Sequence, residues 1–189
     1  MIPQPFITFY TPTFRRPQQL AACLASVQAQ QIADGAIEQI VIPDHVGIGI
    51  AGMFERIGDY AEAVHGRYVH VLADDDQLAS PMAVWAVREA AEAFDYPALL
   101  LVRSRKAGLE LPLDASPWPP VCGRIDLGCL ITRSDIWKQH AHGYGRCYEG
   151  DYVFAQRLHD AGIVPVVLDV LFVQGAVSRG VSEDLAVAG

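Results

Sequence analysis

Hydrophobic and polar positions along the chain follow two alternating patterns. Short runs of apolar and β-forming residues predict strands, at residues 6–10, 37–42, 68–73, 98–102, 127–132 and 164–173. The stretches between them predict helices that begin near Pro17, Met53, Pro81, Ser134 and Asp151. This alternation predicts an α/β fold, with a mainly parallel sheet covered by helices on both faces.

The pattern is that of a single unit without repeats. We expect one domain over residues 1–178 and a weakly structured tail over residues 179–189. Residues 104–123 are rich in proline and glycine and predict a long loop or an irregular hairpin. Trp118 in that segment fits two interpretations, stacking on a sugar ring or closing the edge of the core.

Composition narrows the function classes. Hydrophobic residues make up 51% of the chain and charged residues 19%, which is typical of a globular protein. The formal net charge of −8 argues against broad binding to nucleic acid or anionic membranes. No signal peptide or membrane span is predicted, and the four cysteines lack CxxC spacing. We therefore expect a cytoplasmic protein with reduced thiols, and we allow for a homo-oligomer.

The predicted strand at residues 68–73 ends in three carboxylates, Asp74, Asp75 and Asp76. Ligands bind at the carboxyl ends of strands in open α/β sheets. Two carboxylates at such an end can hold a hard divalent cation, and the cation can hold a diphosphate. One interpretation of Asp74-x-Asp76 is thus a metal–nucleotide site. The other is a solvated turn that caps the next helix.

Further polar positions follow the other predicted strands. Thr11 follows the first strand, Asp44 follows the second, and the loop before Asp151 precedes the last helix. Right-handed crossovers bring the carboxyl ends of parallel strands to one edge of the sheet. The sequence therefore predicts that these positions and Asp74 to Asp76 converge there.

The residues that carry these patterns resemble family 2 glycosyltransferases with the GT-A fold. Four segments are similar to that family in the expected order, namely residues 7–17, 68–76, 128–133 and 149–162. They look like its opening strand and Pro-Thr turn, its DxD strand, the strand beneath the acceptor site, and the acidic helix start. Gly150 stands where the family usually has glutamate.

The resemblance implies a nucleoside diphosphate sugar as donor, with a UDP-sugar favoured, and Mn²⁺ or Mg²⁺ as cofactor. Asp76 would be the direct metal ligand. Asp74 would contact the ribose or the water shell of the metal, and Asp75 would belong to the same donor site. The family's histidine after the acidic helix is missing, so Gln174, Ser178 or water would complete the metal shell.

The resemblance also assigns the nucleobase pocket and the basic residues near the diphosphate. Asp44 would hydrogen-bond the base, and Thr11 and Pro12 would line its pocket. Arg15 and Arg16 fit two interpretations, contact with the diphosphate or simple exposure to solvent.

Asp151 would be the general base that takes a proton from an acceptor hydroxyl, in an inverting transfer. Glu149 is the substitute for this role. The competing interpretation makes Asp151 a helix N-cap, where the helix dipole lowers the basicity of a carboxylate.

Two other functions are compatible with the same residues. A non-catalytic nucleotide-sugar-binding pseudoenzyme is the first alternative. A sugar nucleotidyltransferase is the weaker one, because that class uses a glycine-rich loop after the first strand and residues 11–14 contain no glycine. The acceptor is a molecule with a hydroxyl group, and the sequence does not identify it. Long nucleic acid is the least favoured candidate.

Overall fold

The computed structural model describes residues 4–106, 108–112 and 117–175. Within these ranges the chain forms one eight-stranded sheet with the order β2-β1-β3-β7-β5-β8-β4, and β6 pairs with β5. The strands are β1 (Ile7–Thr13), β2 (Ile37–Pro43), β3 (Tyr68–Val71), β4 (Asp76–Leu78), β5 (Leu99–Lys106), β6 (Leu109–Leu111), β7 (Leu130–Arg133) and β8 (Val166–Gly175). Five of these strands run in one direction, and β4, β6 and β7 run against them. The predicted mainly parallel sheet is confirmed, and its three antiparallel strands make it a mixed sheet.

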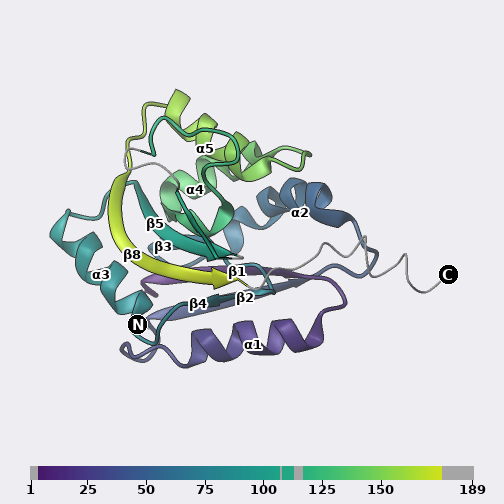
Figure 1. Ribbon diagram of the computed structural model, residues 1–189, viewed down its shortest axis with the longest axis horizontal. Coiled ribbons are helices and arrows are strands. Elements are labelled where there is room, and N and C mark those ends of the chain that lie inside the picture. Colours follow the sequence, from purple (N-terminus) through teal and green to yellow (C-terminus); the bar gives the residue numbers. More distant parts are fainter. Residues whose placement is uncertain (1–3, 107, 113–116, 176–189) are drawn as a thin grey trace.

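Helices cover both faces of the sheet, as predicted. They are α1 (Pro17–Gln28), α2 (Gly49–Ile57), α3 (Ala83–Ala93), α4 (Ser134–His140) and α5 (Gly150–Asp160), with the 3₁₀ turns η1 (Gly58–Ala63), η2 (Leu127–Cys129) and η3 (Ala141–Tyr144). Figure 1 shows α1 on one side of the sheet and α2, α4 and α5 on the other. A hydrophobic core fills each face, because side chains alternate across a strand.

The two cores divide the side chains of β1 between them. Phe9 packs into the core beneath α1 and α3, whereas Tyr10 packs into the core beneath α2, α4 and α5. The second core holds an aromatic cluster, in which the rings of Tyr144 and Phe154 stack with centroids 4.2 Å apart. Trp137 meets Phe154 edge-on, with centroids 5.9 Å apart. This cluster fixes α5, and therefore Asp151, against the sheet.

Several element boundaries differ from the sequence-based predictions. β1 continues to Thr13, so Thr11 lies inside a strand rather than after it. Helix α2 begins at Gly49, four residues before the predicted start near Met53. α3 begins at Ala83 rather than at Pro81. Of the two predictions for residues 104–123, a long loop or an irregular hairpin, the hairpin describes their start, where β5 continues to Lys106 and pairs with β6.

The predicted domain boundary at residue 178, the tail 179–189 and Ser178 lie outside the described residues. Within the described ranges, no helix has the length and apolar character needed to cross a bilayer.

Candidate active site

The carboxylates after β3 lie in a tight turn between two strands. The N–H of Asp76 donates to the carbonyl of Ala73 at 3.0 Å, and Asp76 then opens β4. Because β4 pairs with the end of β8, the side chain of Asp76 is enclosed by the sheet. Asp74 and Asp76 are both buried. The turn therefore places two carboxylates inside the edge of the sheet.

Asp74 and Asp75 share one basic partner, Arg16 at the start of α1. The Arg16 guanidinium Nη1 lies 3.3 Å from Asp74 and 3.1 Å from Asp75. Thr13 at the end of β1 also donates its hydroxyl to Asp74, at 2.8 Å. Burial raises the pKa of Asp74 above its usual range, although Thr13 and Arg16 oppose the rise. Arg16 is thus tied to this acidic turn.

The competing interpretation, that these carboxylates cap the next helix, finds no support in the described contacts. The hydroxyl of Ser80 accepts the Met82 N–H that precedes α3, at 3.3 Å. Asp74 and Asp75 instead face α1 through Arg16.

Asp76 forms an ion pair across the sheet with a residue that the sequence did not point to. The Lys106 ammonium lies 2.9 Å from Asp76 and 3.4 Å from Asp126. Burial is the main reason why the pKa of Asp76 rises to about 6, and Lys106 opposes that rise. The ammonium therefore sits between two carboxylates at the edge of the sheet.

Asp126 is held in place by its own neighbours. The Ser104 hydroxyl donates to one carboxylate oxygen at 3.2 Å, and the Cys129 thiol donates to the other at 3.1 Å. Gly128 allows this approach, since a Cβ there would lie 2.8 Å from the Ser104 hydroxyl oxygen. Asp126 is consequently a fixed carboxylate beside Lys106.

Asp151 lies in the first turn of α5 and accepts the N–H of Tyr152 at 2.7 Å. Burial raises the pKa of Asp151, and the negative charge of Asp126 adds to the rise. The N–H of Tyr152 and the charge of Lys106 act in the opposite direction but are outweighed. The helix start thus does not make Asp151 a weak base.

The start of α5 packs closely against α2. A Cβ on Gly150 would come 2.5 Å from the ring of Phe54, so glycine permits the contact where the family usually has glutamate. Glu149, the substitute base in the sequence interpretation, is exposed and makes no capping hydrogen bond. Asp151 is therefore the more enclosed of the two acidic side chains.

A small pocket of about 20 Å³ opens where β1 and β2 end, next to α2. Its lining contains Pro12 and Asp44, which the resemblance assigned to a nucleobase pocket, and its remaining lining residues are Tyr10, Ile42, Ile48, Met53 and Arg56. The side chain of Thr11 points elsewhere, because neighbouring residues of a strand face opposite sides. Its hydroxyl accepts a hydrogen bond from Gln39 at 3.1 Å.

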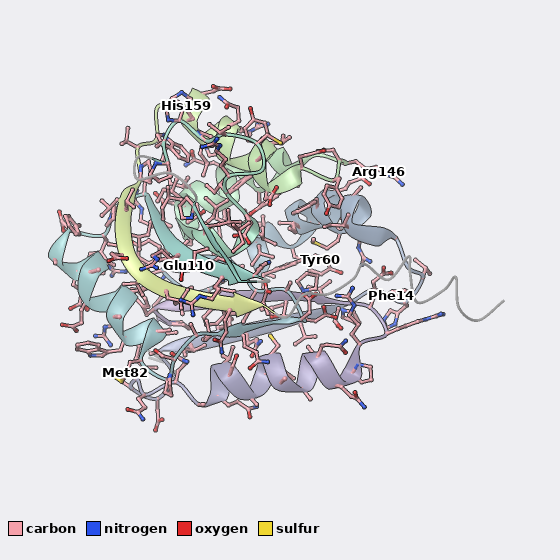
Figure 2. The ribbon with its side chains drawn as sticks, viewed as in Figure 1. Phe14, Tyr60, Met82, Glu110, Arg146 and His159 are labelled. Carbon is pink, nitrogen blue, oxygen red and sulfur yellow. The ribbon has the colours of Figure 1, made fainter. Side chains whose placement is uncertain are left out.

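The Asp44 carboxylate is occupied by the backbone of the loop that follows it. It accepts the N–H groups of Val46, Gly47 and Ile48 at 3.0, 2.9 and 2.7 Å. Burial acts to raise the pKa of Asp44, but these three donors hold it below its usual value. Phe14, labelled in Figure 2, packs against Gly47, where a Cβ would come 2.7 Å from the ring. Asp44 therefore shapes the pocket by fixing this loop.

The donor set suits a hard divalent cation in its chemistry. Carboxylate oxygens, which such a cation prefers, lie at this edge in two ion-paired sets, Asp74 and Asp75 with Arg16, and Asp76 and Asp126 with Lys106. The Asp151 carboxylate lies near the second set. The Lys106 ammonium marks a position where a cation lies between two carboxylates. Within the described residues, no group of three or more histidine, cysteine, aspartate or glutamate side chains is arranged so that it could hold a metal ion by itself. Gln174, proposed as a further ligand, is exposed beside this site.

Lys106 and Asp126 were not predicted as site residues, because no local sequence pattern marks them. Lys106 follows the polar run Arg103 to Arg105, where the predicted loop or hairpin begins. Trp118 had two interpretations, and the structure supports the packing one. It is partly buried against the core beneath α5 and meets His159 edge-on, with ring centroids 5.8 Å apart.

The sequence matches no protein family model and no curated protein. Solved structures do share its fold. TarS 1-349 from S. aureus in complex with UDP-GlcNAc superposes with a TM-score of 0.67 at 13% identity, over 92% of this chain and 59% of that one. The mannosyltransferase PcManGT from Pyrobaculum calidifontis, in complex with GDP-Man and Mn²⁺, gives a TM-score of 0.64 at 9% identity, over 94% of this chain and 58% of that one.

A third structure, A197 from STIV, gives a TM-score of 0.55 at 13% identity, over 86% of this chain and 81% of that one. The chain spans less than two thirds of the length of TarS 1-349 and of PcManGT. These similarities establish that the chain has a glycosyltransferase fold.

Proposed function

We propose that the protein is a glycosyltransferase that moves a sugar from a nucleoside diphosphate sugar to an acceptor hydroxyl. The observation that carries the proposal is the position of Lys106 between Asp76 and Asp126 at one edge of the sheet. Asp151 lies near enough for the charges of Asp126 and Lys106 to act on it. The pocket lined by Pro12 and Asp44 opens at the same edge, where β1, β2 and β3 end. Ligand binding at this edge is the rule for open α/β sheets.

In the proposed reaction, Asp151 accepts the proton of the acceptor hydroxyl. The oxygen forms a bond to the anomeric carbon while the bond from that carbon to the diphosphate breaks, so the configuration inverts. The electron pair of the broken bond leaves with the nucleoside diphosphate. The raised pKa of Asp151 supports its assignment as the base, because a stronger base removes a proton more readily.

Asp76 and Asp74 are the residues that would hold Mn²⁺ or Mg²⁺, with Asp75 and Arg16 next to them. A bound divalent cation supplies positive charge next to the departing diphosphate. Arg16 lies at the same turn and is placed to contact a phosphate once Asp74 or Asp75 has another partner.

A UDP-sugar is the donor that we favour, and family 2 membership and a cytoplasmic location are parts of the same proposal. TarS 1-349 was solved with UDP-GlcNAc, whereas PcManGT was solved with GDP-Man. Pro12 and Asp44 line the pocket proposed for the base.

Donor turnover tests the function and the base together. Release of nucleoside diphosphate is measured for a panel of UDP- and GDP-sugars with Mn²⁺, using wild type and Asp151→Asn. We expect turnover by wild type and a loss of at least about a hundredfold in Asp151→Asn, the usual worth of a general base. Donor affinity, measured by calorimetry, should stay within about twofold of wild type, since the substitution removes only proton acceptance.

Asp160→Asn is the matched control, because Asp160 lies at the other end of α5 and accepts a hydrogen bond from Gln156 at 2.9 Å. It should turn over like wild type. Equal turnover in Asp151→Asn and wild type would refute the base assignment. Binding without turnover would identify a nucleotide-sugar-binding pseudoenzyme, and a need for pyrophosphate would identify a nucleotidyltransferase. If the protein neither binds nor turns over any of these donors, the proposed function is refuted.

A further inference from the structure

Lys106 and Asp76 meet across a strand that leaves room for them. In the sheet, Gly175 of β8 is the partner of Asp76 on one side and of Lys106 on the other. A Cβ on Gly175 would collide with the Asp76 carboxylate and lie 3.1 Å from Cγ of Lys106. The absence of a side chain at this position therefore allows the ion pair to form over the backbone of β8.

Lys106 is the most exposed member of this ion-paired set. Its side chain is 34% exposed, whereas that of Asp76 is 4% exposed and that of Asp126 is 14% exposed. A lysine ammonium is a compact point charge on a flexible stem, so it can leave a carboxylate without disturbing the backbone. The Asp76 and Asp126 carboxylates, by contrast, are held by the sheet and by Ser104 and Cys129.

We propose that Lys106 is the resident counter-ion of the Asp76 carboxylate, and that a divalent cation binds there only by displacing the Lys106 ammonium. This inference rests on the proposed function, since it concerns the metal next to the donor diphosphate. Lys106 then sets how tightly the protein binds metal without a donor.

Elementary electrostatics supports this competition. A buried carboxylate without a partner is costly, and Lys106 supplies that partner when no metal is bound. A divalent cation at Asp76 would lie within a few ångströms of the ammonium if Lys106 stayed, and like charges at that distance repel strongly. The displaced ammonium has three N–H donors, which suit a diphosphate. The nucleotide-free protein therefore binds the metal weakly, and the protein binds it tightly when a nucleoside diphosphate is also bound.

The decisive experiment measures Mn²⁺ binding by the nucleotide-free protein, with calorimetry and electron paramagnetic resonance. Lys106→Met keeps most of the stem and removes the charge. We expect Lys106→Met to bind Mn²⁺ at least tenfold more tightly than wild type, and UDP to tighten Mn²⁺ binding less in the variant than in wild type. Mn²⁺ affinity within twofold of wild type, or no Mn²⁺ binding by either protein, would overturn the proposal.

The sequence contains one other lysine, Lys138, which provides a matched control. Lys138 lies in α4 and pairs with Glu62 at 3.3 Å, away from Asp76. Lys138→Met should bind Mn²⁺ like wild type. Equal tightening in both variants would show that total charge, and not the position of Lys106, controls metal binding, and this too would overturn the proposal.

A second measurement uses protein in which Lys106 is kept, so it does not depend on whether a Lys106 variant folds. With only two lysines, ¹⁵N-lysine labelling gives two ammonium signals, and Lys138→Met identifies them. We expect the Lys106 signal to shift on saturation with Mg²⁺ and the Lys138 signal to stay. A Lys106 signal that does not move while Mg²⁺ binds would overturn the proposal.

These measurements use no donor sugar and no activity, so the two proposals can fail separately. Glycosyl transfer with unchanged Mn²⁺ affinity in Lys106→Met would remove the role of Lys106 alone. Tighter Mn²⁺ binding by Lys106→Met, without turnover of any donor by wild type, would remove the proposed reaction alone.

Discussion

Asp151 and Asp44 both lie next to the start of a helix, yet their pKa values move in opposite directions. Asp151 is largely enclosed, has Asp126 nearby and accepts the N–H of Tyr152, so its pKa rises. Asp44 accepts three backbone N–H groups, so its pKa falls. The number of hydrogen-bond donors and the depth of burial decide the outcome, because both act on the charged form. Asp151 is thereby suited to accept a proton, and Asp44 to stay charged.

His70 shows the same physics in the core beneath α1 and α3. It is fully buried, and its Nδ1 lies 2.9 Å from the Leu130 carbonyl, which places a donating N–H there. Its Nε2 has no partner among the described residues. Burial is the main reason why the pKa of His70 falls to about 4.

We predict that His70 makes folding stability fall in acid. Below about pH 6.5 the unfolded chain takes up a proton at His70, whereas the folded protein does so only near pH 4. Above pH 6.5 His70 therefore does not lower the free energy of unfolding. As pH falls from 6.5 towards 4, it lowers the free energy of unfolding by roughly 3 kcal/mol in total. Urea unfolding from pH 4.5 to 8 on wild type and His70→Phe measures it, since phenylalanine cannot take up a proton.

The difference between the two proteins is the quantity to compare, because Asp76 acts in the opposite direction. Its raised pKa of about 6 means that the folded protein holds a proton there which the unfolded chain has lost, so stability falls as pH rises from 3.8 to 6. His45→Phe, at an exposed position, is the control. A stability difference between wild type and His70→Phe that is equal at pH 5 and pH 8 would contradict the prediction.

At the scale of elements, the loop between β2 and α2 depends on Asp44. Its carboxylate bonds the N–H groups of Val46, Gly47 and Ile48, directly before α2 begins at Gly49. Aspartate orders turns through such bonds to backbone N–H groups a few residues further along the chain. The loop and the wall of the pocket therefore share one anchor.

We predict that Asp44→Ala lowers the free energy of unfolding by about 1–2 kcal/mol, because the loop loses the acceptor of three backbone hydrogen bonds. Urea denaturation at pH 7 measures it, and Asp44→Asn should recover part of the loss because its side-chain oxygen still accepts hydrogen bonds. His45→Ala, at the neighbouring exposed position, should leave stability within about 0.5 kcal/mol. Wild-type stability in Asp44→Ala would show that the loop holds itself.

The element boundaries show how far local patterns reach. The strand at residues 37–42 and the helix from Pro17 were predicted to within a few residues, because apolar spacing follows the period of each structure. β4 and the far half of β5 were missed. β4 is only three residues long, and residues 103–106 are all polar, so neither segment has the apolar pattern that predicts a strand. Both segments become strands because β8 pairs with them.

For the whole molecule, we predict that UDP with Mn²⁺ raises the unfolding temperature. A ligand at about a hundred times its Kd stabilises the folded state by about 2.7 kcal/mol, which is about 5–10 °C for a domain of this size. Differential scanning fluorimetry measures the shift, with UMP as the control ligand that lacks the second phosphate. Asp76→Asn should lose the Mn²⁺-dependent part of the shift. No shift with UDP or GDP, with or without Mn²⁺, would contradict nucleotide binding.

The sequence by itself determined the α/β class, the helices on both faces and the acidic turn at Asp74 to Asp76, since each is written in a few neighbouring residues. The tertiary structure alone decided the partners of that turn. Lys106 reaches Asp76 only because the strand register sets both beside Gly175. Thr11 points away from the pocket that Pro12 lines, because both are neighbouring residues within β1. Charges far apart in the chain interact through space, and local periodicity does not contain the strand register that brings them together.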